Sequence, residues 1–186
     1  MKHYLLSMFL FFTLISNAQV QRTFYGVPLG ASIEQTKTLL SKQGVRFSQS
    51  DDNLGNPIIN IPSVRIGGHI VDKAVMVFSK DAFYNIQFHK MFNYPYLSNG
   101  DDFFDNLHSD LSKKYSVLDK YEIDKGYSTT TILIYGLRND KKTRIMLEFI
   151  RVPSNRSACL ILVYFENNQD IEELIRLKIG GRNNEL

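Results

Sequence analysis

The sequence predicts an α+β protein made of two helix-then-antiparallel-strand units, with the helices packed on one face of an antiparallel sheet. Two segments with helical spacing of apolar residues, 32–43 and 101–115, are each followed by several strand-like segments. The strand at 82–91 alternates apolar and polar residues, which indicates a sheet with one buried and one wet face. Lys80-Asp81 separates this strand from the one at 73–79 by only two residues, as in a tight hairpin.

The first 18 residues have the three parts of a secretory signal peptide. Residues 2–3 are polar and basic, residues 4–15 are nearly all apolar, and residues 16–18 place small side chains before a cut at Gln19. The apolar run is too short to cross a bilayer, which takes about 20 residues. We therefore expect residues 1–18 to be removed. The mature chain is then a soluble exported protein, periplasmic or extracellular, with no transmembrane segment.

The first helix is predicted over residues 32–43, after an extended segment at 24–30. Ser32 and Gln35 have the spacing of a capping box, in which each side chain satisfies a free backbone N–H of the other residue. Gly44 marks the C-terminal end of the helix. The face expected to be buried consists of Ile33, Thr36, Leu39 and Leu40.

Four strand-like segments follow the first helix. The segments 58–61 and 64–70 are short and interrupted by prolines and glycines, so we expect them at an edge of the sheet. The segments 73–79 and 82–91 are stronger strand candidates. In the second of these, Tyr84, Ile86 and Phe88 alternate with Asn85, Gln87 and His89.

The second unit begins after a linker at residues 93–100. A helix is predicted over 101–115, where Asp101 and Asp102 suit the positive end of the helix dipole. Strands are then expected at 117–123, 128–137, 143–152 and 157–166, followed by a short helix at 169–178. This last helix carries Ile171, Leu174 and Ile175 on one side.

The order of helix, then strands, occurs twice at an offset of 70 residues. Ser32 and Asp102 open the two helices, and Met76 and Met146 occupy matching strands. This similarity is either an internal repeat or a coincidence of two α+β segments. We interpret residues 19–97 and 98–186 as two units that together form one compact domain, because each half is small for an independent core.

Charge and cysteine content exclude some classes of protein. The net charge of +3 falls to about +2 without the signal peptide, which is too small to indicate a nucleic-acid partner. Cys159 is the only cysteine, so no internal disulfide can form. Its place in the apolar run 158–163 predicts a buried small side chain. No cysteine follows the apolar run of the signal peptide, so a lipid anchor is not expected.

The opening of the mature chain resembles a known group of proteins. Residues 24–30, which lead into a capped helix, and Lys42-Gln43-Gly44-Val45 are similar to the start of small exported proteins of Bacteroides-type bacteria, most of them uncharacterised. Their units resemble the repeats of the β-lactamase-inhibitor-protein-like fold and, more distantly, the outer-membrane assembly lipoprotein BamE. The chain lacks the repeat-internal disulfides of the inhibitors and the lipidation cysteine of BamE. The resemblance implies helices on one side of an antiparallel sheet whose other face is available to a partner.

No catalytic residues, metal site or cofactor are predicted from motifs. His69, His89 and His108 lack the spacing of metal ligands such as HxH or HExxH, and we expect them at the surface. Asp51-Asp52-Asn53 begins like a calcium loop, but the later carboxylates are missing.

Two sets of residues are candidates for a binding surface. The first is the polar face of the strand at 82–91: Asn85, Gln87 and His89. The second is the pair Tyr94 and Tyr96 in the linker, because loop tyrosines bring contact area at a low entropy cost. The alternative for the tyrosines is that the linker packs against the core.

These observations favour a non-catalytic exported protein that binds another envelope protein or a glycan through its sheet face or its linker. Two alternatives stay open: an envelope hydrolase whose site is assembled only in the fold, and a structural component of the envelope. Clustering of the three histidines with carboxylates in a deep pocket would favour the hydrolase.

Overall fold

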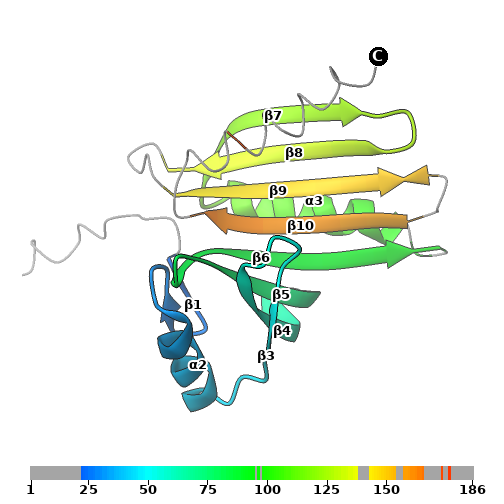
Figure 1. Cartoon of the computed structure of the whole chain (residues 1–186). Coiled ribbons are helices and arrows are strands. Elements are labelled where there is room, and N and C mark those ends of the chain that lie inside the picture. The colour runs from blue at the N-terminus through cyan, green and yellow to red at the C-terminus, as the bar shows by residue number, and fades with distance from the viewer. Residues whose placement is uncertain are drawn as a thin grey trace, which may run out of the picture.

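The chain is built around one large antiparallel sheet, as its computed structural model shows (Figure 1). The structure describes residues 22–94, 96, 98–137, 143–153, 157–165, 173 and 176. The elements in chain order are β1 (Thr23–Phe24), β2 (Val27–Pro28), α2 (Ile33–Lys42), β3 (Ser48–Asp51), β4 (Pro57–Ile66), β5 (His69–Ser79), β6 (Ala82–Asn93), α3 (Ser98–Ser112), β7 (Ser116–Asp124), β8 (Thr129–Gly136), β9 (Arg144–Val152) and β10 (Ser157–Phe165).

Eight of these strands form the sheet in the order β3-β4-β5-β6-β10-β9-β8-β7. The four strands that follow α2 and the four that follow α3 therefore meet at the centre, where β6 pairs with β10. Nine residue pairs make this junction, from Ser157 opposite Asn93 to Phe165 opposite Asn85. The pairing joins strands from residues 19–97 and 98–186 in one continuous sheet.

The predicted fold class, α+β with two helix-then-strand units, is wrong. Strands dominate the described residues, and α2 and α3 are the only helices with described bounds. α3 crosses one face of the sheet against β6 and β10, whereas α2 lies beside β2 near one end of β6 (Figure 1). The order of segments along the chain does not reveal that two sets of strands will pair edge to edge. That pairing satisfies the free edges of β6 and β10, and it produces one wide sheet instead of two units.

The start of α2 follows the predicted capping box. The Gln35 backbone N–H donates to Ser32 Oγ at 3.2 Å, and the Ser32 N–H donates to Gln35 Oε1 at 3.0 Å. Leu40 is buried on the inner side of the helix. Gly44, with a φ of +67°, ends the helix in a conformation that disfavours other residues. The prediction of this helix is confirmed to within about a residue at each end.

α3 begins at Ser98, three residues before the predicted start at 101, and β6 extends to Asn93. The expected linker at 93–100 is therefore much shorter. Gly100 allows the close approach, because a Cβ there would lie 3.2 Å from Phe92 and Phe149 on the sheet. The first turn of α3 is thus held directly against the sheet.

The edge that contains β3 and β4 differs from the prediction. β3 was missed because its four residues are all polar and exposed, so no alternation marks it. β4 is one strand that runs through Pro62, whereas two broken strands were expected. Pro62 is tolerated because β3 pairs only with residues 57–60, so the other side of β4 is a free edge at this point.

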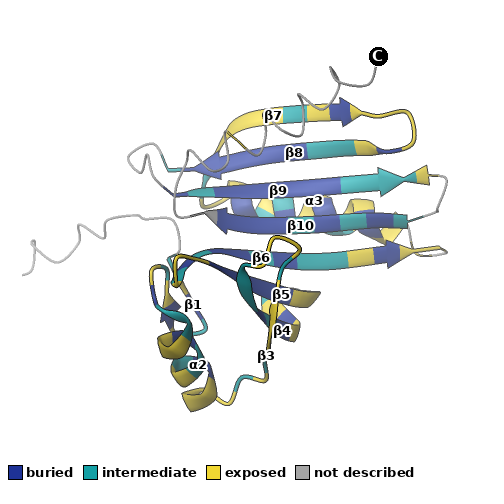
Figure 2. Ribbon diagram, viewed as in Figure 1, coloured by how far each residue is buried: buried dark blue, intermediate teal, exposed yellow. Residues whose placement is uncertain are grey.

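The two sides of the sheet are called here the helix face and the far face. The helix face packs against α3, and Leu133, Leu147 and Leu162 form a row across β8, β9 and β10 in its core. The far face is the opposite side and carries Gln87 on β6 and Met146 on β9, because successive side chains alternate between faces. Figure 2 shows that buried residues make up much of β8, β9 and β10.

Two predicted segments fall largely outside the described residues. These are the signal peptide at 1–18 and the helix at 169–178, of which only residues 173 and 176 are described. In the part of the chain that is described, no helix has the length and apolar character needed to cross a membrane.

Candidate functional site

The predicted polar face of β6 forms a hydrogen-bonded row on the far face. Gln87 Nε2 donates to Asn85 Oδ1 at 3.5 Å, and His89 Nε2 donates to Gln87 Oε1 at 3.2 Å. Asn85 is only 2% exposed, so it accepts the hydrogen bond from Gln87 in the protein interior, away from solvent. Gln87 and His89 are half-buried and reach the surface. We call Asn85, Gln87 and His89 the polar row.

The His89 ring is neutral near neutral pH. Burial, and secondly the charge of Lys73, lower its pKa from 6.5 to about 4. Lys73 lies directly opposite His89 on β5 and is exposed. Because Nε2 carries the proton that is donated to Gln87, Nδ1 holds a lone pair that accepts hydrogen bonds. The site therefore combines a cation, an amide and a neutral imidazole.

The other side of the polar row is apolar. Ile161 on β10 lies opposite His89, and Val163 lies opposite Gln87. Directly opposed residues in an antiparallel pair have Cβ atoms about 5 Å apart, so these side chains border the polar row. The site is thus a polar strip edged by aliphatic groups.

Cys159 lies on the same face, diagonal to His89, since it pairs with Met91. The prediction of a buried cysteine is wrong: the side chain is half-buried, because alternation turns it away from the core of the helix face. Burial, followed by the charge of Glu148, raises the pKa of the thiol. A raised pKa keeps the thiol protonated, and a protonated thiol is a poor nucleophile. The imidazole of His89 and the thiol of Cys159 therefore do not form an activated pair.

Tyr94 and Tyr96 do not join the polar row. They are 65% and 66% exposed and follow the end of β6, where the Tyr96 N–H donates to Asn93 O at 2.9 Å. His89 and Tyr94 are five residues apart, a distance of about 16 Å along a strand. The five predicted binding residues therefore form two separate groups.

The remaining histidines are on the opposite side of the sheet. His69 Nε2 donates to Asp110 Oδ2 of α3 at 3.0 Å, beside a small cavity of about 90 Å³ lined in part by Tyr164. His108 on α3 shares a hydrogen bond of 2.6 Å with the hydroxyl of Tyr135, whose pKa is raised by burial. The three histidines are not brought together, and the described residues contain no group of side chains able to hold a metal ion.

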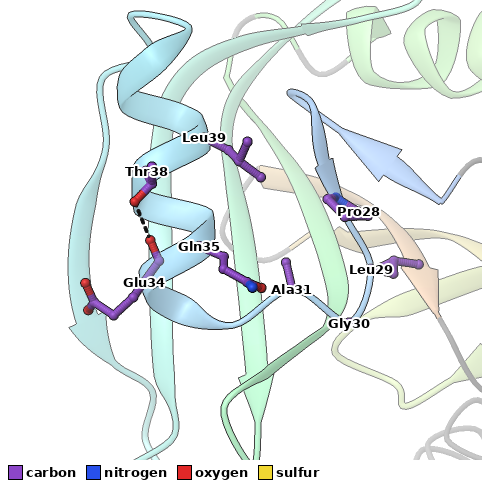
Figure 3. Close-up of a pocket in the computed structure, with 8 residues that line it drawn as sticks. All are labelled: Pro28, Leu29, Gly30, Ala31, Glu34, Gln35, Thr38 and Leu39. Carbon is purple, nitrogen blue, oxygen red and sulfur yellow. Dashed lines mark hydrogen bonds between the residues drawn. The ribbon is translucent and has the colours of Figure 1, made fainter.

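A larger groove, which sequence patterns did not indicate, lies between β2 and α2 (Figure 3). Its volume is about 720 Å³. It is lined by Pro28, Leu29, Gly30, Ala31, Glu34, Gln35, Thr38 and Leu39. The Thr38 hydroxyl donates to the Glu34 carbonyl oxygen at 2.9 Å, so one polar group of the lining is already occupied within the helix. The lining offers aliphatic surface and one carboxylate, without a cluster of reactive groups.

Comparisons with protein-family models, with curated proteins and with solved structures found no match.

Proposed function

We propose that this chain is an exported, non-catalytic binding protein that recognises a partner through the polar row and Lys73 on the far face of the sheet. The observation that supports this most is the half-buried, hydrogen-bonded pair Gln87 and His89 in the middle of a sheet. Half-buried polar groups at a central strand give little stability by themselves, but they present oriented donors and acceptors to a ligand.

The chemistry of the surface favours a polypeptide partner over a glycan. Lys73 supplies N–H donors, and Nδ1 of His89 supplies an acceptor, which complement the carbonyl and N–H groups of an extended peptide. Ile161 borders the row with half-buried aliphatic surface, whereas Val163 beside it is buried. Glycan sites commonly use aromatic faces for stacking, and the exposed tyrosines lie beyond the end of β6. We therefore place another envelope protein before a glycan as partner.

Export to the periplasm or the cell exterior is part of this proposal. It is supported by the signal-peptide pattern of residues 1–18 and by the resemblance of residues 24–30 to small exported proteins of Bacteroides-type bacteria.

A comparison of capture by four variants tests the proposal. The chain lacking residues 1–18 is immobilised, incubated with a bacterial envelope fraction, and the retained proteins are identified by mass spectrometry. Gln87→Ala and His89→Ala are expected to lose at least one partner that the parent chain retains. Tyr94→Ala and Tyr96→Ala are the matched controls and are expected to keep that partner. Circular dichroism establishes that all variants are folded.

Two results would overturn the proposal. One is equal retention of every protein by the parent and all four variants. The other is turnover of an ester, peptide or glycan substrate by the purified chain, which would favour an envelope hydrolase.

A further inference from the structure

A small cavity on the helix face lies where the end of α3, the turn between β4 and β5, and β10 meet. We call it the α3 cavity. Its volume is about 90 Å³, well below the roughly 300–1,000 Å³ of sites for drug-sized ligands, so an occupant has only a few non-hydrogen atoms. Leu107, Leu111 and Leu162 are buried and supply apolar lining. The half-exposed side chain of Asp110 marks the side on which the cavity meets solvent.

The most deeply buried polar side chain that lines the α3 cavity is that of Tyr164. It is only 4% exposed, and its ring packs against Phe24 at a centroid distance of 4.9 Å. Its hydroxyl forms no hydrogen bond with any residue that the structure describes. Burial, and secondly the charge of Tyr115, raise the pKa of Tyr164, so the hydroxyl keeps its proton. Tyr115 also lines the cavity, which places the interacting ends of the two rings at this space. A buried donor without a protein partner favours an occupant that accepts a hydrogen bond.

The charges around the α3 cavity favour an anion. The carboxylate of Asp110 is already engaged: Oδ1 accepts from Lys113 Nζ at 2.7 Å and Oδ2 accepts from His69 Nε2 at 3.0 Å, and these bonds lower its pKa. The carbonyl oxygen of Leu111, in the last turn of α3, accepts two backbone N–H groups at 3.0 and 2.9 Å. Lys114 also lines the cavity, and no carboxylate of a described residue pairs with it. Among the described lining residues, the uncompensated charge is therefore the ammonium group of Lys114.

We propose that the α3 cavity binds a short-chain carboxylate of the size of propionate. The carboxylate accepts from the Tyr164 hydroxyl and pairs with Lys114, and the alkyl group packs among Leu107, Leu111 and Leu162. The leucines favour an alkyl group over water alone, because a buried water needs about two to four polar partners and leucine side chains offer none. The inference does not depend on the proposed function, since the polar row lies on the opposite face of the sheet.

A titration of the ¹⁵N-labelled whole chain, followed by amide chemical shifts, tests the proposal. Propionate is expected to produce saturable shifts at residues around the α3 cavity. Its dissociation constant is expected to be on the order of 1 mM, because so small a ligand has few atoms with which to gain affinity. Propionamide has the same number of non-hydrogen atoms but no charge, and it is expected to bind at least about tenfold more weakly. Sodium chloride keeps the ionic strength of all samples equal.

Two substitutions in the α3 cavity, each with a matched control, identify the groups that bind propionate. Tyr164→Phe removes only a hydroxyl, and its control Tyr135→Phe removes a hydroxyl from a buried ring of the same core. Lys114→Gln removes a charge, and its control Lys125→Gln removes an exposed charge between β7 and β8. Both cavity substitutions are expected to raise the dissociation constant of propionate about fivefold or more, whereas both controls leave it unchanged. Circular dichroism establishes that the variants are folded.

Three results would overturn the proposal. The first is the absence of saturable shifts around the α3 cavity on addition of propionate. The second is binding of propionamide as tight as that of propionate, which would show that no charge is recognised. The third is an equal dissociation constant of propionate for a cavity variant and its control. If Tyr164→Phe does not fold, the comparison of Lys114→Gln with Lys125→Gln decides the third point.

Discussion

Replacement of His89 by glutamine is expected to remove a specific part of the acid sensitivity of the fold. In the folded chain the pKa of His89 is lowered from 6.5 to about 4, first by burial and then by Lys73. Between these values the unfolded chain binds a proton that the folded chain does not. The neutral ring of His89 therefore contributes to the free energy of unfolding in full above pH 6.5. This contribution is lost as the pH falls from 6.5 toward 4, because protonation favours the unfolded chain.

The size of the effect follows from the two pKa values. A tenfold change in proton affinity corresponds to 1.36 kcal/mol, so the difference between 6.5 and about 4 sets an upper limit of about 3 kcal/mol. His89 is half-buried, and solvent contact reduces the effect of the desolvated environment. We expect the parent chain to lose about 1–2 kcal/mol more than His89→Gln between pH 7 and pH 4.5.

Urea unfolding followed by circular dichroism at several pH values measures this difference. Glutamine retains an N–H donor for Gln87 and does not titrate, so the comparison isolates the proton equilibrium of His89. Groups that titrate equally in both chains cancel. Parallel stability curves for the parent chain and His89→Gln from pH 7 to pH 4.5 would show that the ring is not desolvated as described.

Two further predictions concern the core and the helix cap. Leu147→Ala is expected to lower the free energy of unfolding by about 2–5 kcal/mol, because Leu147 is fully buried on the helix face. Leu54→Ala, at an exposed loop position, is the control and should change it by about 0.5 kcal/mol or less. Ser32→Ala is expected to cost about 1 kcal/mol by removing the acceptor for the Gln35 N–H, whereas Ser41→Ala within α2 should cost less. Urea titrations measure the free energy of unfolding of the four variants. An equal loss for Leu147→Ala and Leu54→Ala would contradict the first prediction, and an equal loss for Ser32→Ala and Ser41→Ala would contradict the second.

Local signals in the sequence predicted local structure well. The spacing of Ser32 and Gln35 specified the start of α2, because both halves of a capping box lie within one helical turn. The alternation along residues 82–91 predicted correctly that Gln87 and His89 point away from the core that contains Phe88. In both cases the physical cause acts over a few neighbouring residues.

Features that depend on pairing between distant strands were not predictable in the same way. Counting back from the turn at Lys80-Asp81 would place Asp72 opposite His89, but a bulge between Val77 and Phe78 shifts the register so that Lys73 lies there. Ile161 borders the polar row only because β10 pairs with β6. The composition of the site and the width of the sheet both follow from contacts that leave no local pattern.

The junction between β6 and β10 has a consequence for how the chain folds. Its paired residues are separated by 64 to 80 positions in the sequence, whereas the connections from β3 to β6 and from β7 to β10 are only two to seven residues long. Loops of that length close slowly compared with hairpins, so this pairing is a candidate for the rate-limiting step of folding. During synthesis β6 is complete long before β10 exists, and its free edge is a template for pairing with other chains. The strand at the centre of the finished sheet is therefore an unpaired edge in the nascent protein.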